Sequence, residues 1–359
     1  MTGEFKIGNR PIGPGRPAYI IAELSANHNR SFDEAVKLVR AAKDIGADAV
    51  KLQTYTADTL TIRCDRPEFR IGGGTLWDGK TLHDLYGEAY TPWDWQPRLK
   101  QVADEIGIHL FSTPFDPTAV DFLEAMDVPA YKIASFEMID LPLIEKVART
   151  GKPVIMSTGM ATREEIDEAV AAVRRHGVDL ALLKCTSAYP ARPEDANLRT
   201  IVDLGQRYGV PAGLSDHTMG IAVPVAAIAL GACIIEKHLT WSRSVPGPDA
   251  AFSLEIEEFR DLIAAVRVAE RALGEVRYGT GEQEAASRVF RRSLFAVADI
   301  QAGQPFTEAN VRSIRPGYGL PPKYLPAILG RFAPRDIPRG TPLSWDLLPE
   351  TAVPRKAAG

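Results

Sequence analysis

Short β-prone runs alternate with longer helical patterns eight times in this chain of 359 residues, and no other feature restricts its fold as strongly. Eight strand–helix units in series are the number that closes a parallel (β/α)8 barrel. An open, doubly wound sheet is the alternative, although it rarely needs eight uninterrupted units. We therefore predict an α/β fold of the TIM-barrel type. The strands are expected at residues 18–24, 49–55, 109–115, 130–135, 153–158, 181–187, 212–215 and 233–240.

The segment 62–95 interrupts this rhythm after the second predicted strand. A loop of this length in a compact domain usually serves a function. We expect a lid over the mouth of the barrel, although a segment that packs only on itself remains the alternative. Its aromatic residues are Trp77, Tyr86, Tyr90, Trp93 and Trp95.

A second break follows the last predicted helix, at residues 255–273. Residues 278–289 are polar and contain glycine, which predicts a linker. Beyond it the pattern changes to short strands and turns with several prolines. The chain is therefore expected to comprise a barrel domain at 1–277, a linker at 278–289 and a small separate domain at 290–350.

Composition narrows the range of partners. A net charge of −4 gives no general attraction to nucleic acid or to anionic membranes. The three cysteines form no even framework, and Cys185 and Cys233 lie in apolar runs, which is typical of a reducing compartment. The chain has no apolar run near the roughly 18 residues of a membrane span. We expect a cytoplasmic protein that binds neither nucleic acid nor membrane.

Two histidines, His217 and His238, stand at the ends of the seventh and eighth predicted strands. The carboxyl ends of barrel strands meet at one mouth, where such barrels place their chemistry. Two neutral imidazoles there can hold a divalent metal. Each histidine could instead cap its strand through local hydrogen bonds. Because the pair is flanked by further charged residues, we favour the functional interpretation.

Lys51 and Lys132 lie inside other predicted strands, where a lysine is costly to bury without an anionic partner. Glu23 or Glu137 could supply that partner in a purely structural pair. A phosphate or carboxylate ligand is favoured instead, because small hydroxyl residues cluster at the same strand ends. A Schiff base on Lys132 or Lys184 is a third option. A metal argues against it, since the metal can already polarise a carbonyl.

Several motifs, in this order along the chain, resemble the sialic acid synthase family. The resemblance covers residues 5 to 350, and the C-terminal part resembles the antifreeze-like (SAF) module of those enzymes. Within the family, residues 7–13 and 73–82, together with Ser187, resemble the pseudaminic acid synthase branch. The family motifs are Ile21-Ala-Glu-Leu-Ser-Ala-Asn-His, Val50-Lys-Leu-Gln-Thr, Phe111-Ser-Thr-Pro-Phe, Tyr131-Lys-Ile-Ala-Ser, Ser157-Thr-Gly-Met, Cys185-Thr-Ser-Ala-Tyr-Pro and Gly213-Leu-Ser-Asp-His.

The resemblance implies that phosphoenolpyruvate condenses with an open-chain 2-acetamido sugar, in this branch 2,4-diacetamido-2,4,6-trideoxy-L-altrose. It also implies a divalent metal (Mn²⁺, Mg²⁺ or Co²⁺) on His217 and His238, with Glu23 as the carboxylate beside the reacting carbons. Arg315 would reach the sugar from the partner subunit of a domain-swapped homodimer. The other implied substrate-binding residues are Lys51, Thr113, Lys132, Ser135, Ser157, Ser187 and Ser215 for phosphoenolpyruvate, and Gln53, Tyr189 and Asp249 for the sugar.

Attack by the methylene carbon of phosphoenolpyruvate on the aldehyde places positive charge on its second carbon, which a carboxylate at Glu23 would stabilise. Water then adds to that carbon, and phosphate leaves by C–O cleavage. N-acetylneuraminate and legionaminate synthases remain alternatives. A metal-dependent or Schiff-base aldolase and a non-catalytic carbohydrate- or ice-binding protein are more distant ones. The role of His28 stays open between a structural residue and a support for the reacting groups.

Overall fold

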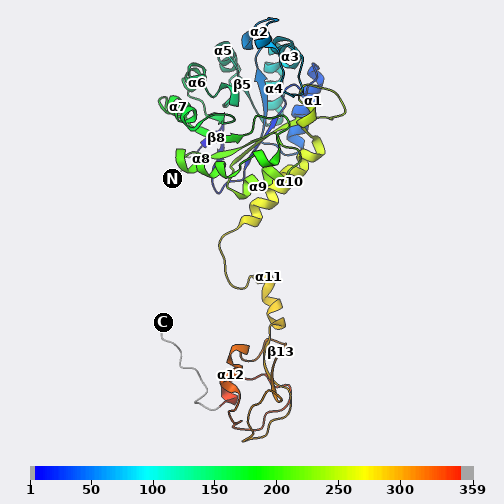
Figure 1. The fold of residues 1–359 in the computed structure, drawn as a ribbon, viewed down its shortest axis with the longest axis vertical. Helices are drawn as coiled ribbons and strands as arrows, with labels where there is room; N and C mark the ends of the chain where they lie inside the picture. Colours follow the sequence, from blue (N-terminus) through cyan, green and yellow to red (C-terminus); the bar gives the residue numbers. More distant parts are fainter. Residues whose placement is uncertain (1–4, 349–359) are drawn as a thin grey trace. The chain divides into compact units, whose positions relative to one another are not determined.

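Eight parallel strands close into a barrel in the computed structural model, which describes residues 5–348 (Figure 1). Strands consecutive along the chain pair with each other, and the eighth pairs with both the first and the seventh. The predicted TIM barrel is confirmed. Its strands are β3 (Tyr19–Glu23), β4 (Ala49–Thr54), β5 (His109–Pro114), β6 (Tyr131–Ile133), β7 (Val154–Ser157), β8 (Leu180–Cys185), β9 (Ala212–Asp216) and β10 (Ile234–Thr240).

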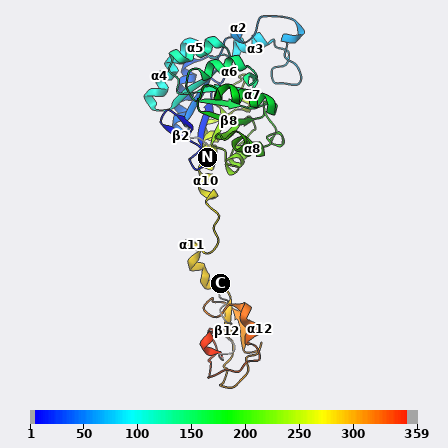
Figure 2. The same cartoon turned by 90° about the vertical axis from the view of Figure 1, so that its left-hand side faces the viewer.

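The helices between these strands surround the barrel (Figure 2). Side-chain oxygens cap two of them at the amino end: Ser31 accepts a hydrogen bond from Glu34 N, and Thr162 accepts one from Glu165 N. Of the helices in residues 5–348, none is long and apolar enough to cross a membrane. The helices are α1 (Phe32–Asp44), α4 (Gln96–Ile106), α5 (Pro117–Ala125), α6 (Leu141–Ala148), α7 (Arg163–Arg174), α8 (Arg199–Tyr208), α9 (Ala222–Ala229) and α10 (Ile256–Leu273).

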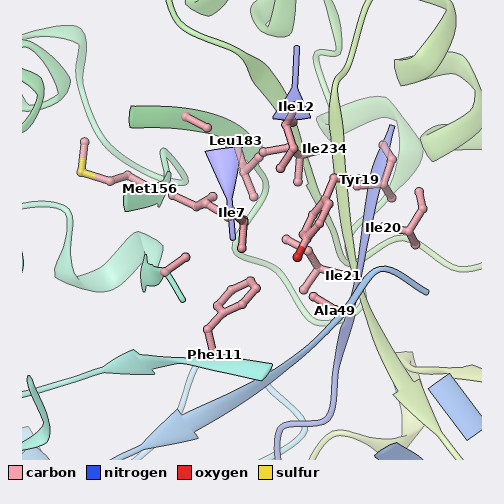
Figure 3. Close-up of a cluster of buried hydrophobic side chains, with 14 of the residues drawn as sticks. Ile7, Ile12, Tyr19, Ile20, Ile21, Ala49, Phe111, Met156, Leu183 and Ile234 are labelled. Atoms are coloured by element: carbon pink, nitrogen blue, oxygen red, sulfur yellow. The ribbon is translucent and has the colours of Figure 1, made fainter. Parts of the chain in front are cut away.

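An antiparallel hairpin, β1 (Phe5–Ile7) and β2 (Arg10–Ile12), covers the amino-end opening of the barrel. Its Gly8 approaches the side chain of His109, the first residue of β5, so closely that an added Cβ would lie 3.1 Å from the His109 Nε2 atom. Ile7 and Ile12 are buried among apolar side chains from several barrel strands (Figure 3). The sequence did not predict this hairpin, because its two strands are only three residues long.

The long segment after β4 is partly helical. It holds α2 (Ala57–Leu60), α3 (Leu82–Ala89) and two short 3₁₀ turns at Pro67–Phe69 and Trp93–Trp95. The part between α2 and α3 extends as a loop at one end of the barrel (Figure 2). This segment therefore begins where a carboxyl-end lid would begin, directly after the second barrel strand.

The chain divides into two compact units at Gly274. The second has its own small core around Leu294, Phe306 and Leu343, with strands β12 (Ser293–Ala296) and β13 (Val311–Ile314) paired antiparallel and a short helix α12 (Leu325–Ile328). The expected linker is not irregular throughout, since it contains α11 (Glu282–Ala285), where the Glu284 carboxylate accepts a hydrogen bond from Gly281 N. The end of the expected 290–350 domain lies outside the described residues.

Candidate active site

Two buried lysines and two buried carboxylates meet inside the barrel near the carboxyl ends of its strands. Lys51 of β4 forms an ion pair with Glu23 of β3, and its Nζ lies 3.8 Å from Glu236 Oε1. The Lys132 Nζ of β6 lies 3.7 Å from the same oxygen. None of these four side chains is more than 7% exposed. Glu236, on β10, therefore joins two lysines that come from different strands.

Burial and mutual charge decide how these groups are protonated. Burial raises the pKa of Glu23 to about 7, although the charge of Lys51 opposes the shift. Burial also acts to raise the pKa of Glu236, but Lys132 and Lys51 outweigh it and the pKa is lowered. Burial lowers the pKa of Lys132. The network thus holds an ionised carboxylate between the lysines and a second carboxyl group that can exchange a proton near neutral pH.

Hydroxyl groups from neighbouring strands surround the charges. Lys51 donates to Thr113 Oγ1 at 3.1 Å, and Lys132 donates to Ser157 Oγ at 2.6 Å. The Ser215 hydroxyl donates to the shared carboxylate of Glu236 at 3.3 Å. The two lysines and three hydroxyl groups, all five indicated by the sequence, form a set of donors and cations around one point of the barrel, which is suited to an anionic ligand.

Ser135 and Ser187 come together beside the loop that follows β7. The Gly159 N–H donates to Ser135 Oγ at 3.1 Å. An added Cβ at Gly159 would lie 2.4 Å from Ser187 Oγ and 2.6 Å from Ser135 Oγ, so only glycine permits this approach. The backbone N–H and the two hydroxyls thus extend the group of donors.

The rings of His217 and His238 lie side by side, with centroids 5.4 Å apart. The His217 Nδ1 is 2.9 Å from the carbonyl oxygen of Thr186 and donates to it, so that the neutral ring carries its lone pair on Nε2. Burial acts to lower the pKa of His217, but Cys185 and the Thr186 carbonyl outweigh it and the pKa is raised. The His238 Nδ1 is buried without a hydrogen-bond partner. Burial lowers the pKa of His238 well below its ordinary value, so that its ring is neutral at pH 7.

These two imidazoles fit an open metal site. A neutral ring nitrogen with no partner is the form in which histidine binds a divalent ion, and the Thr186 carbonyl fixes the orientation of the other ring. Within residues 5–348, no three His, Cys, Asp or Glu side chains are grouped as they would be around a fully enclosed ion. Water and a substrate oxygen would have to complete the coordination, as they do in catalytic rather than structural sites.

Aromatic side chains connect the histidines to the long segment after β4. The ring of Tyr189 lies tilted against that of His217, with 4.4 Å between the centroids, and the ring centroids of Trp77 and Tyr189 are 5.7 Å apart. The Trp77 indole N–H donates to the carbonyl of Pro248 at 3.0 Å. The segment therefore reaches the mouth of the barrel, and it does not pack only on itself.

The other residues expected on the sugar side lie at the same end. Asp249 accepts hydrogen bonds from the Ser25 hydroxyl and from Ala26 N, and burial raises its pKa to about 6. Gln53 follows Lys51 by two residues on β4 and so shares its face of the strand. These groups continue the polar lining outward from the lysines.

A cavity of about 550 Å³ lies between the long segment and the loops after β3 and β10. Its inner wall includes Ala26 and Trp77, which contact Asp249 and Tyr189 respectively. Both apolar and charged side chains line it. The lining residues are Ala26, Asn29, Arg30, Leu76, Trp77, Lys80, Glu88, Pro246, Gly247, Pro248 and Ala251.

The structure also assigns a place to three other residues. Both ring nitrogens of His28 are used, Nε2 with Thr91 Oγ1 at 3.1 Å and Nδ1 as acceptor from Arg30 N at 3.1 Å, so His28 is a structural residue that ties two loops together. Lys184 is next to Cys185, which faces the barrel interior, so the Lys184 side chain leaves the opposite face of β8. Its Nζ donates to the carbonyl of Cys185 at 2.6 Å. Arg315 follows β13 in the second unit.

Glu236 is the member of the network that the sequence analysis left out of its list of site residues. The sequence could have indicated Glu236, because it precedes His238 by two residues on the same strand and its side chain therefore lies on the same face as that of His238. Its strand register places it opposite Ser215.

The family comparison agrees with the arrangement of these groups. Residues 38–278 match the sequence profile of the NeuB family, and residues 291–349 match that of the SAF domain. The first match covers more than half of the chain. The chain belongs to the NeuB family. This confirms the resemblance that the motifs indicated.

Among individual members of the NeuB family, pseudaminic acid synthase of Campylobacter jejuni is 45% identical over 340 residues, which cover 94% of this chain and 98% of the relative. Pseudaminic acid synthase of Helicobacter pylori is 45% identical over 333 residues, 92% of this chain and 98% of the relative. The crystal structure of N-acetylneuraminic acid synthetase from Leptospira borgpetersenii, in complex with citrate, superposes with a TM-score of 0.71 at 32% identity, covering 80% of this chain and 95% of that one.

Proposed function

We propose that the protein is a pseudaminic acid synthase, which condenses phosphoenolpyruvate with 2,4-diacetamido-2,4,6-trideoxy-L-altrose and water and releases phosphate. The observation that carries the proposal is the pair of buried lysines, Lys51 and Lys132, beside the two histidines at the mouth of a NeuB-family barrel. Two relatives that are 45% identical to this chain over more than nine-tenths of its length are pseudaminic acid synthases.

Phosphoenolpyruvate carries a phosphate and a carboxylate, and the buried cations provide one charge for each. Lys132 with Ser135, Ser157 and Ser187 would hold the phosphate, and Lys51 with Thr113 would hold the carboxylate. Ser215 donates to Glu236 Oε1, the same oxygen that both lysines approach. Because these side chains are already fixed by hydrogen bonds to one another, they need little rearrangement to receive the ligand.

Glu23 is proposed to act on the carbon that reacts with water. When the methylene carbon attacks the sugar aldehyde, positive charge develops on the neighbouring carbon, and an ionised Glu23 stabilises it. A group with a pKa of about 7 can also take up the proton that the attacking water releases. The resulting tetrahedral carbon then loses phosphate by breaking its C–O bond, and the proton of its hydroxyl group passes to the leaving phosphate as the keto group forms. Lys132 holds the departing phosphate, and Lys51 holds the carboxylate.

His217 and His238 are proposed to hold a divalent ion such as Mn²⁺, Mg²⁺ or Co²⁺. A bound ion would polarise the aldehyde carbonyl and stabilise the alkoxide that forms from it. The orphaned Nδ1 of His238 and the fixed tautomer of His217 support this assignment. Chelation should abolish turnover and added Mn²⁺ should restore it, whereas full activity after exhaustive chelation would exclude the metal.

The distal part of the sugar is proposed to lie against Tyr189, Asp249 and Gln53 and to extend into the cavity beside Trp77. The apolar walls from Leu76, Trp77 and the prolines suit the methyl groups of a 6-deoxy diacetamido sugar, and the charged rim suits its amide oxygens. N-acetylmannosamine, the acceptor of N-acetylneuraminate synthases, has a hydroxyl group at carbon 6 in place of this methyl group, so this space is where those synthases would be expected to differ.

Mass spectrometry with a panel of acceptors tests the substrate assignment. The enzyme should convert phosphoenolpyruvate and 2,4-diacetamido-2,4,6-trideoxy-L-altrose to pseudaminic acid, with much slower reaction of N-acetylmannosamine or of the sugar precursor of legionaminate. A preference for either of those sugars would move the protein to another branch. Product formation from pyruvate in place of phosphoenolpyruvate would indicate an aldolase.

We also propose that the second unit completes the site of a partner subunit in a swapped homodimer. The loops at the carboxyl ends of the strands and in the long segment expose large apolar side chains, which a monomer would leave in water. Tyr318, near Arg315 in the second unit, is 72% exposed. The exposed residues around the barrel mouth are Ile62, Leu76, Phe136, Ile139, Met160, Met219, Trp241 and Val245.

Mixing two inactive variants tests the swap. Glu23→Ala and Arg315→Ala proteins should each have little activity, but heterodimers made by refolding them together should regain it, because one of their two composite sites has both residues intact. If demonstrated heterodimers regain no activity, each site is built within one chain.

We also propose that the enzyme is cytoplasmic, in keeping with its three free cysteines.

A further inference from the structure

A second charged pair lies on β9 and β10, one residue before each histidine. Asp216 and Lys237 are paired in the register of the two strands. The Lys237 Nζ is 2.5 Å from Asp216 Oδ2, and the two side chains are 0% and 2% exposed for lysine and aspartate. Neither residue contacts the lysine–carboxylate network in the barrel interior, because side chains alternate along a strand.

This pair lies on the outer face of the strands. The Glu258 carboxylate of α10 is among the charges that act on Lys237, so the lysine faces the helical layer and not the substrate. A buried ion pair contributes little net stability compared with apolar side chains of similar size. Stability alone therefore does not explain why this ion pair is buried between the barrel wall and a helix.

The pair fixes the backbone on both sides of His217. The Asp216 Oδ1 accepts hydrogen bonds from Thr218 N at 3.0 Å and from the Thr218 hydroxyl at 2.9 Å. The Lys237 Nζ donates to the carbonyl of Thr218 at 2.5 Å as well as to Asp216. The Lys237 ammonium group thus binds both neighbours of His217, Asp216 and Thr218. Lys237 itself directly precedes His238.

We infer that Asp216 and Lys237 are positioning residues that fix the separation and orientation of His217 and His238, and so prepare the two imidazoles for one metal ion. The inference rests on the proposed metal site. Supporting partners of metal ligands typically change metal affinity by about 10–100-fold when they are removed. The pair acts across the strands β9 and β10, where a slip of either loop would move one histidine relative to the other.

The test replaces both charges together, since a single replacement would leave one buried charge unpaired and could prevent folding. In D216L/K237M, circular dichroism should match the unaltered protein, whereas the affinity for Mn²⁺ by calorimetry should fall about 10–100-fold. The visible spectrum of bound Co²⁺ should also change, which a purely structural role would not cause. The variant D216N/K237M loses the hydrogen bond from Lys237 to the Thr218 carbonyl but keeps an acceptor for the Thr218 N–H and hydroxyl, and it should lose less affinity.

The pair Glu124 and Lys152, whose side chains are 3.0 Å apart near the start of β7, provides the matched control. In E124L/K152M the same charges are removed at the opposite end of the strands, and Mn²⁺ affinity should not change. Unchanged Mn²⁺ affinity in either folded variant of Asp216 and Lys237 would overturn the inference. If the unaltered protein binds neither Mn²⁺ nor Co²⁺, the metal proposal itself fails, which is a separate result.

Discussion

The two ends of the barrel interior are built from the same strands but have opposite chemistry. At the amino end, Tyr19, Phe111 and Ile234 pack against the hairpin in an apolar core (Figure 3). A few residues later, on the same inward face, β3 places Glu23 and β10 places Glu236. These strands are therefore divided along their length, so that the first half holds the barrel together and the second half carries the chemistry.

This division sets different expectations for substitutions at the two ends. Apolar side chains at the amino end stabilise the fold by removing surface from water. Burying charged side chains at the carboxyl end lowers the stability of the fold. These side chains serve to bind and transform a ligand. Changes at the amino end should therefore reduce stability and leave catalysis intact, and changes at the carboxyl end should do the reverse.

Phe111→Ala should have the largest effect. The Phe111 ring is fully buried, and truncating a buried phenylalanine typically costs about 3–5 kcal/mol because of lost burial and the cavity that remains. Chemical denaturation should show this loss. The fraction that stays folded should keep the KM and kcat of the unaltered protein, and a large change in KM for phosphoenolpyruvate would mean that the two halves of β5 are not independent.

Lys132→Met should reverse that pattern. Removing the cation that donates to Ser157 should lower kcat/KM for phosphoenolpyruvate roughly 10²–10³-fold, the usual effect of deleting one electrostatic contact to a transition state. Stability should fall, because Glu236 loses one of its two buried cations, but Lys51 stays 3.8 Å from Glu236 and limits the loss. Lys152→Met, at the amino end of β7, serves as the control and should leave kcat/KM unchanged. Activity near normal in Lys132→Met would contradict the anion site.

Glu137→Gln tests the cost of burying charge at this end through pH. Burial raises the pKa of Glu137 from 4.5 to about 7. Between pH 4.5 and 7 the unfolded chain releases this proton while the folded protein keeps it, so the stability of the unaltered protein falls as pH rises through that window. Glutamine cannot ionise. The free energy of unfolding of Glu137→Gln, compared with that of the unaltered protein, should therefore increase from pH 4.5 to 7 by up to about 3 kcal/mol and then level off.

Thermal melts of both proteins across this pH range provide the measurement. A difference between them that stays constant with pH would show that Glu137 has an ordinary pKa, and that its unpartnered Oε2 atom is in effect solvated.

Trp77→Ala should have the smallest effect. Because Trp77 lies against Tyr189 and lines the cavity proposed for the distal sugar, its loss should raise KM for the sugar by about tenfold and KM for phosphoenolpyruvate much less. Trp95, which packs against Phe32 away from this cavity, offers a control of the same type. Equal increases in both KM values would mean that Trp77 supports the fold of the segment only.

Most of the barrel could be predicted from the sequence because each unit carries its own signals. Strand β10 spans Ile234–Thr240, close to the predicted 233–240, and α1 follows Ser31, a residue type that commonly caps helices. The hairpin β1–β2 could not be predicted, since three-residue strands give too little periodicity and depend on contacts with residues such as His109, far away in the chain.

The site could be predicted only in part, for a related reason. Lys51 and Lys132 attract notice because lysine is unusual in an apolar strand, and the structure brings both to one point. The partner that joins them, Glu236, depends on how β10 closes beside β3, which is a property of the whole barrel. The cavity beside Trp77 likewise arises from three segments that are distant in the sequence.

The central claim is that phosphoenolpyruvate reacts at carbon, within the network of Lys51, Lys132 and Glu23. Phosphoenolpyruvate labelled with ¹⁸O at the oxygen that bridges carbon and phosphorus tests it directly, in a reaction with the diacetamido sugar followed by mass spectrometry of both products. We predict that the label leaves with phosphate, because water adds to carbon and the C–O bond breaks. Label retained in the keto acid would show cleavage at phosphorus and would contradict the roles proposed for these three residues.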